Sequence, residues 1–218
     1  MIRLENLTKI YRLDGQSKTV ADNINATFPT GVSVALLGRN GAGKSTLLKI
    51  IAGTEDPSSG RVVSTGSISW PVGFAGSFHP DLTGQQNVRF IGRIYGVDTD
   101  EFSEFVEDFA GLGVHYRLPF RTYSSGMRSR LAFGTSMGIA FDTYLVDEVT
   151  AVGDAIFRAR STEVFNARMR NAGAIVVTHS VGQVREMCQA VAVLENGKLH
   201  YYDNLDAGIA HHNRNMRS

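Results

Sequence analysis

The feature that most constrains the fold is a glycine-rich segment around residue 40, with the pattern G-x-x-x-x-G-K-S/T. It follows an apolar run, Val32–Leu37, that predicts a strand buried on both faces, and it precedes apolar residues at helical spacing. Strand, glycine loop and helix are the context in which such a segment binds phosphate. An ordinary glycine-rich turn is the alternative, and it leaves the lysine and the hydroxyl without a role. The segment consists of Gly38, Arg39, Asn40, Gly41, Ala42, Gly43, Lys44, Ser45 and Thr46.

The segment also predicts which groups would meet a phosphate chain. Glycines leave little side chain in the way, so successive backbone N–H groups can point at one anion. A helix beginning near Lys44 adds the positive end of its dipole. Lys44 would bring a charge to the β- and γ-phosphates, and the Ser45 hydroxyl would ligate Mg²⁺.

Composition narrows the class of protein. The chain has 218 residues, 43% of them hydrophobic, which suffices for one large α/β domain or one with a subdomain. A net charge of +1 with scattered basic residues argues against a nucleic-acid binder. The single cysteine, Cys188, excludes an internal disulfide and fits a reducing compartment. No apolar stretch approaches the ~20 residues of a membrane span, so we expect any membrane association to occur through a partner.

The order of predicted elements gives an α/β architecture. Loosely alternating strands over 2–12 and 20–28 come before the phosphate-binding unit, and a mostly helical insertion is predicted over about 84–140. Within it, four apolar residues at i, i+3, i+4 and i+7 predict a packed helix face: Phe102, Phe105, Val106 and Phe109. The later elements are strands over 143–146 and 174–177, helices over 155–170 and 181–189, a hairpin turning at Asn196-Gly197, and a short helix after Asn204.

Two more polar sites follow apolar strands. Asp147 and Glu148 end the run Tyr144–Val146, and a buried strand that ends in a carboxylate presents it at the carboxyl edge of the sheet. There Asp147 would hold Mg²⁺ and Glu148 would orient an attacking water. His179 follows the apolar strand over 175–177, and it would either donate to the γ-phosphate or serve a structural role.

A serine-rich segment forms the fourth candidate site. Tyr123-Ser124-Ser125-Gly126-Met127 precedes a helical run. The serines can act as a plain N-cap, or the helix end can hold the phosphate of a nucleotide. The residue types alone leave both interpretations open.

In this order the four sites resemble those of an ATP-binding cassette (ABC) ATPase. Gly38–Thr46 is similar to the Walker A motif, Tyr144–Glu148 to Walker B with its glutamate, and His179 to the switch histidine. Tyr123–Met127 is similar to the signature motif. The resemblance implies a P-loop NTPase fold with an antiparallel β subdomain, a mostly parallel core sheet and a helical subdomain, all in one domain over residues 1–218. It also implies ATP as the nucleotide and places Tyr11 where an aromatic stacks on adenine, although a plain strand aromatic fits there too.

Three departures from the general pattern resemble capsular polysaccharide exporters. The signature reads Tyr-Ser-Ser-Gly-Met, the segment 149–154 replaces the usual Ser-Ala-Leu-Asp, and residues 78–84 read Phe-His-Pro-Asp-Leu-Thr-Gly. Related O-antigen exporters often carry a further carbohydrate-binding domain, so a chain that ends at Ser218 favours the capsule branch. No residue of 73–79 matches the family's metal-linking glutamine, and Gln85 and Gln86 fit that role poorly.

The resemblance implies a mechanism and partners. Two copies would close on ATP, each ATP lying between the phosphate loop of one copy and Ser124, Ser125 and Gly126 of the other. An integral membrane permease would receive the motion and would link to periplasmic and outer-membrane export components. Phe78 and His79 are candidate contacts for it, and packing inside the helical insertion is an equally good interpretation of both. The chain would sit on the cytoplasmic side of the inner membrane, without nucleic acid. The alternatives are a soluble ABC-type ATPase acting on nucleic acid or ribosomes, and a small-molecule kinase.

Overall fold

The computed structural model describes residues 1–13, 15–147 and 154–217. The chain forms two compact units. The sheet unit contains the described residues within 1–71, 141–149 and 171–218, and the helical unit contains those within 72–140 and 150–170. Across the described residues, every helix is too short or too polar to cross a bilayer.

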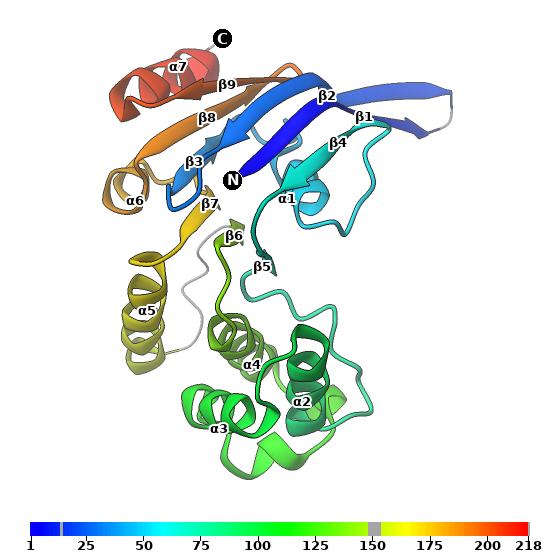
Figure 1. The fold of residues 1–218 in the computed structure, drawn as a ribbon, viewed down its shortest axis with the longest axis vertical. Coiled ribbons are helices and arrows are strands. Elements are labelled where there is room, and N and C mark those ends of the chain that lie inside the picture. Colours follow the sequence, from blue (N-terminus) through cyan, green and yellow to red (C-terminus); the bar gives the residue numbers. More distant parts are fainter. Residues whose placement is uncertain (14, 148–153, 218) are drawn as a thin grey trace. The chain divides into compact units, whose positions relative to one another are not determined.

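The sheet unit begins with a three-stranded antiparallel sheet in the order β2-β1-β4 (Figure 1). Its strands are β1 (Ile2–Leu13), β2 (Gln16–Phe28) and β4 (Ser59–Ser64). The register of the β1–β2 hairpin pairs Leu13 with Gln16 and Tyr11 with Lys18. Register shifts interrupt β1 on both sides of Leu7, which bends the strand locally.

A six-stranded sheet carries the core of this unit in the order β5-β6-β7-β3-β8-β9. All neighbouring strands are parallel except β9, which runs antiparallel to β8. Asn196 and Gly197 have φ values of 48° and 78°, so the predicted Asn-Gly turn is a tight hairpin turn that needs two left-handed residues. The strands are β3 (Val34–Leu37), β5 (Ile68–Pro71), β6 (Thr143–Asp147), β7 (Gly173–Val177), β8 (Ala190–Glu195) and β9 (Lys198–Tyr202).

One apolar cluster joins both sheets to helix α1 (Lys44–Ile51). Leu4 and Leu7 from β1, Leu47 and Leu48 from α1, and Leu36 from β3 are among its buried members. Every residue of β3 and β7 is buried, as their continuous apolar sequences predict. The remaining helices of this unit are α6 (Val181–Met187) and α7 (Leu205–Arg217), and α7 packs on β8 and β9 (Figure 1).

The helical unit contains α2 (Gly84–Tyr95), α3 (Thr99–Ala110), α4 (Ser125–Gly138) and α5 (Ala155–Met169). Two short 3₁₀ helices, Gly113–Arg117 and Phe120–Thr122, connect α3 to α4. Thr83 caps α2 in a reciprocal capping box with Gln86, and Asp98 caps α3. The unit begins before residue 84 and includes α5, which follows β6 in the chain.

Aromatic side chains fill the core of the helical unit. Phe109 lies 5.8 Å from Phe133 and 5.2 Å from Phe157, measured between ring centroids. Phe102 and Val106 are buried beside it, and Phe105 stacks on Phe109 at 5.9 Å. The sequence prediction that this face of α3 packs inside the protein is therefore confirmed.

Candidate functional site

The predicted phosphate loop lies between β3 and α1, and both sheets support it. Gly43 is left-handed, with φ of 105°, and a Cβ atom there would stand 2.8 Å from the Cβ of Val20 on β2. At Gly38, a Cβ atom would stand 2.5 Å from the carbonyl oxygen of Leu194 on β8. Side chains at these two positions would push the loop away from its supports, so glycine is required for close approach as well as for conformation.

Lys44 is held within the curve of the loop. Its ammonium group donates to the carbonyl oxygens of Gly38 and Arg39 at 2.8 and 3.0 Å, and only 7% of the residue is exposed. A buried ammonium group needs such acceptors, and a phosphate chain would offer stronger ones. The pKa of His212 on α7 is lowered by burial, and the positive charge of Lys44 lowers it further. The surroundings of the loop thus favour anions.

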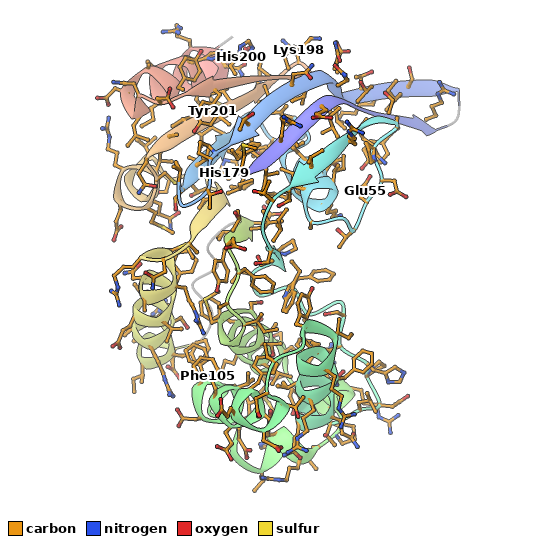
Figure 2. All side chains as sticks on the ribbon, viewed as in Figure 1. Glu55, Phe105, His179, Lys198, His200 and Tyr201 are labelled. Atoms are coloured by element: carbon orange, nitrogen blue, oxygen red, sulfur yellow. The ribbon has the colours of Figure 1, made fainter. Side chains whose placement is uncertain are left out.

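The carboxyl ends of β6 and β7 bring the next two predicted residues to the same edge. Asp147 is the last residue of β6 and pairs in register with Val177, the last residue of β7. Val177 pairs in turn with Leu36 on β3, one strand further along the sheet. His179, labelled in Figure 2, follows β7 after one intervening residue and is exposed. Parallel strand order therefore places Asp147 and His179 at the edge from which the phosphate loop emerges.

These residues line one cavity of about 440 Å³. Lys18, Val20 and Val177 also line it, although the sequence patterns had given none of them a role. Lys18 could have been found from hairpin pairing, which sets it opposite Tyr11. The predicted residues that line the cavity are Tyr11, Asn40, Gly41, Gly43, Lys44, Ser45, Thr46, Asp147 and His179.

The polar groups that line this cavity fit a nucleotide with a bound magnesium ion. Its walls combine a lysine ammonium, a loop rich in backbone N–H groups, the Ser45 hydroxyl and the Asp147 carboxylate. Hydroxyl and carboxylate oxygens are the protein ligands that Mg²⁺ prefers, and magnesium usually binds through one or two of them plus substrate phosphates. Tyr11 is 41% exposed and adds an aromatic ring to the same wall.

The serine-rich segment belongs to the helical unit. Ser124 is the N-cap of α4, and its hydroxyl accepts from the backbone N–H of Met127 at 3.3 Å. Ser125 and Gly126 begin the helix. A capping role is therefore established for Ser124, and it leaves the predicted contact of this segment with a nucleotide untested. Glu148 lies outside the described residues.

Two further residues that the sequence analysis considered have structural roles. Phe78, a candidate contact for a membrane subunit, is only 7% exposed and packs against Phe120 at 5.0 Å between ring centroids. Of the two interpretations of Phe78, the structure supports packing inside the helical unit, whereas His79 beside it is exposed. The Gln86 side chain accepts from the backbone N–H of Thr83 at 2.9 Å, so it serves the cap of α2.

Comparisons with known proteins agree with this arrangement. A family model described as "ABC transporter" matches residues 21–151. Polysialic acid transport ATP-binding protein KpsT of Escherichia coli is 48% identical over 212 residues, covering 96% of this chain and 95% of that protein. Capsule polysaccharide export ATP-binding protein CtrD of Neisseria meningitidis serogroup B is 40% identical, covering 98% of this chain and 99% of that protein.

A solved structure supports the fold. The ATP-binding cassette MJ0796, determined as a dimer bound to ADP and Pi, superposes with a TM-score of 0.76. That match covers 92% of this chain and 97% of MJ0796 at 20% identity, so it bears on the fold alone. The predicted ABC-type fold, with an antiparallel sheet beside a mostly parallel one and a group of helices, is confirmed. By its family model, its relatives and its fold, the chain belongs to the ABC transporter family as one of its ATP-binding cassette proteins.

Proposed function

We propose that this chain hydrolyses ATP to drive export of a capsular polysaccharide across the inner membrane. The observation that carries the proposal is the shared cavity, in which the phosphate loop, Asp147, His179 and Tyr11 meet. The names of the full-length relatives, one a polysialic acid transport protein and one a capsule polysaccharide export protein, support the choice of cargo. One cassette domain spans residues 1–218 in this proposal, with a helical subdomain over about 84–140.

Each residue of the site then has a role in hydrolysis. The loop backbone and Lys44 bind the β- and γ-phosphates, and Lys44 exchanges its carbonyl acceptors for phosphate oxygens. Ser45 and Asp147 would hold Mg²⁺, which neutralises charge on the phosphate oxygens when it is bound. His179 donates a hydrogen bond to the γ-phosphate. Glu148 orients the attacking water and accepts its proton, a role that rests on its place in the motif.

A second copy of the chain completes each site. Ser124, Ser125 and Gly126 of one copy bind the γ-phosphate of the ATP held by the other copy. These contacts exist only in the closed pair, so ATP favours closure and ADP does not. Free energy from closure and reopening is passed to a membrane permease, which connects to the periplasmic and outer-membrane parts of the exporter. The chain itself works on the cytoplasmic side of the inner membrane.

The decisive experiment joins the chain to its permease. The chain is co-purified with the multi-spanning protein encoded beside it, and ATP hydrolysis is measured with and without that partner in lipid vesicles. We expect the partner to change the rate, and we expect Glu148→Gln to abolish turnover while ATP binding survives. Full turnover by Glu148→Gln removes that residue from the mechanism, and failure to associate with any permease argues against the transport role.

A further inference from the structure

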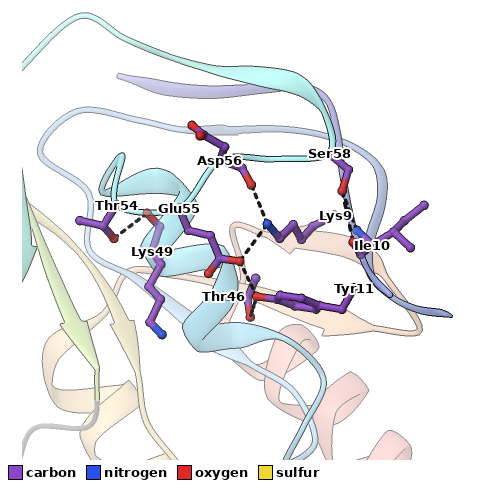
Figure 3. A network of polar contacts seen from close by, with 9 residues as sticks. All are labelled: Lys9, Ile10, Tyr11, Thr46, Lys49, Thr54, Glu55, Asp56 and Ser58. Carbon is purple, nitrogen blue, oxygen red and sulfur yellow. Dashed lines mark hydrogen bonds and ion pairs between the residues drawn. The ribbon is translucent and has the colours of Figure 1, made fainter. Parts of the chain in front are cut away.

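The hydroxyl group of Tyr11 has one hydrogen-bonding partner in the first turn of α1 and another just beyond the end of that helix. It donates to the Glu55 carboxylate at 2.5 Å, and it lies 3.2 Å from the Thr46 hydroxyl in the first turn of the helix (Figure 3). Lys9, two residues before Tyr11 on β1, contacts the same Glu55 oxygen at 2.9 Å. A tyrosine on an open cavity wall usually keeps its hydroxyl in water, so two protein partners for this one restrict the ring to one position.

Glu55 is itself held by the turn that ends α1. Gly53 has φ of 71°, its N–H donates to the Ile50 carbonyl at 3.1 Å, and the Thr54 N–H donates to the Lys49 carbonyl at 3.0 Å. This pair of bonds with a left-handed glycine is the Schellman arrangement that closes helix ends. The Thr54 hydroxyl adds a further bond to the Lys49 carbonyl at 3.1 Å. The carboxylate therefore projects from a constrained turn.

The segment after Glu55 is tied to the strand that carries Tyr11. The Asp56 carbonyl accepts from the Lys9 ammonium at 2.7 Å, and the Ser58 N–H donates to the Thr8 carbonyl at 2.8 Å. The Ile10 N–H donates to the Ser58 hydroxyl at 3.0 Å. Figure 3 shows the Lys9–Asp56 and Ile10–Ser58 bonds beside the Glu55 carboxylate. Strand β1 and the end of α1 thus form one braced assembly around the Tyr11 side chain.

Lys9 also acts on the ring of Tyr11. Its ammonium nitrogen lies 5.1 Å from the ring centroid, a distance typical of cation–π contact. A cation on one face of a ring leaves the other face for a flat ligand. The pKa of Glu55 is held below its usual range by the hydrogen bond from Tyr11 and by Lys9, so the carboxylate is charged at neutral pH. The network is complete without any ligand, and preorganisation of this kind reduces the entropy that binding would otherwise cost.

We propose that Glu55, together with Lys9, is a positioning pair that holds the Tyr11 ring ready for the base of the nucleotide. The inference rests on the proposed function, in which Lys44 binds the phosphates, and on the sequence prediction that the Tyr11 ring stacks on adenine. Neither Glu55 nor Lys9 lines the cavity, so both act through Tyr11. Because Tyr11 also meets Thr46, the ring is positioned relative to the phosphate loop and not to the strand alone.

The test compares a ligand that has a base with one that lacks it. Binding of the non-hydrolysable ATP analogue AMPPNP and of inorganic tripolyphosphate is measured by calorimetry on the full chain with Mg²⁺. One hydrogen bond at this position predicts that Tyr11→Phe and Glu55→Leu each weaken AMPPNP binding by about 3- to 10-fold. Tripolyphosphate binding stays within about twofold of the unchanged chain. Glu55→Gln, which keeps an acceptor oxygen, loses less than Glu55→Leu.

Glu5 supplies a matched control. It is also a carboxylate with two basic partners, Arg3 at 2.6 Å and Arg61 at 2.7 Å, and its side chain is 22% exposed against 21% for Glu55. We expect Glu5→Leu to leave both affinities unchanged. In the double variant Tyr11→Phe/Glu55→Leu, the loss should be no greater than in the worse single variant, because both remove the same bond.

The outcomes distinguish failure of the positioning role of Glu55 and Lys9 from failure of the base site at Tyr11. Unchanged AMPPNP affinity in Glu55→Leu, or an equal loss for tripolyphosphate, overturns the positioning role. If Tyr11→Ala itself leaves AMPPNP binding unchanged, the base site of the proposed function fails. If Tyr11→Ala weakens binding and Glu55→Leu does not, only the positioning pair is refuted.

Discussion

The contact between Gly43 and β2 leads to a measurable difference between two loop glycines. Alanine at position 43 would adopt a left-handed conformation at φ of 105°, which costs about 1–2 kcal/mol. Its Cβ atom would also stand 2.8 Å from the Cβ and 3.2 Å from the carbonyl oxygen of Val20. Overpacking against a fixed strand costs about 1–3 kcal/mol more. The free energy of unfolding should therefore fall by about 2–5 kcal/mol, the sum of those two costs.

Gly41 provides the comparison, because it shares the conformation without the contact. Its φ is 77°, and the nearest atom to an added Cβ is the terminal nitrogen of Lys18 at 3.8 Å. Only the conformational cost of about 1–2 kcal/mol applies to Gly41→Ala. At about 3 °C per kcal/mol for a chain of this size, Gly41→Ala should lower Tm by about 3–6 °C and Gly43→Ala by about 6–15 °C.

Differential scanning calorimetry on the nucleotide-free chain measures both shifts. Adding Val20→Ala to Gly43→Ala should not restore Tm, because alanine at position 20 keeps the Cβ atom that makes the closest contact. Equal shifts for the two glycine variants would show that β2 yields to the loop at no cost. Recovery on adding Val20→Ala would show that the contact involves the outer methyl groups. Either result refutes the explanation given for Gly43.

Three further predictions concern single side chains. Lys44→Ala should weaken ATP binding by about 10- to 100-fold, the value of a charge-assisted hydrogen bond, and unchanged affinity in calorimetry would contradict the loop assignment. Tyr116 is fully buried, its hydroxyl lies 3.1 Å from that of Ser103, and burial raises its pKa to about 12. Tyr116→Phe should therefore cost about 1–3 kcal/mol in urea unfolding, and absorbance titration at about pH 11 should show at least one neutral tyrosine in the native chain and one fewer in Tyr116→Phe. Because the folded pKa of Glu55 lies below its usual 4.5, the stability that it adds is complete above that pH and is lost as pH falls through the folded value. Melting curves of the unchanged chain and of Glu55→Gln should accordingly converge at low pH and separate above pH 4.5.

Local sequence signals predicted most of the elements. The capping residues Thr83 and Asp98 stand at the starts of α2 and α3, and Asn196-Gly197 forms the β8–β9 turn. These features depend on a few neighbouring residues, so the sequence contains what is needed to predict them. The strand, loop and helix around the phosphate loop were predictable for the same reason. The terminal helix α7 is longer than expected, because packing on β8 and β9 stabilises it beyond its own weak signal.

The assembly of the cavity was only partly predictable. Asp147 and His179 were expected to share a sheet edge, and strand order confirms that they line one cavity. Lys18 and Glu55 carried no motif, because their importance comes from pairing across the β1–β2 hairpin and from the turn after α1. The sequence left Phe78 undecided between a partner contact and internal packing, because an aromatic in a loop gives no sign of the ring that will cover it. The surroundings of Lys18, Glu55 and Phe78 depend on contacts that a sequence motif does not record. The catalytic roles proposed for the site residues stay predictions.

The antiparallel sheet has a larger part in the site than its place outside the parallel core suggests. β2 supports Gly43 of the phosphate loop, and β1 carries Tyr11 and Lys9. The Tyr11 hydroxyl then reaches Thr46 at the start of α1 and Glu55 after its end. The proposed base side and the proposed phosphate side of the site are thus linked through one helix of eight residues. A perturbation of β1 should consequently reach base recognition first, because Lys44 takes its acceptors from the loop itself and not from that sheet.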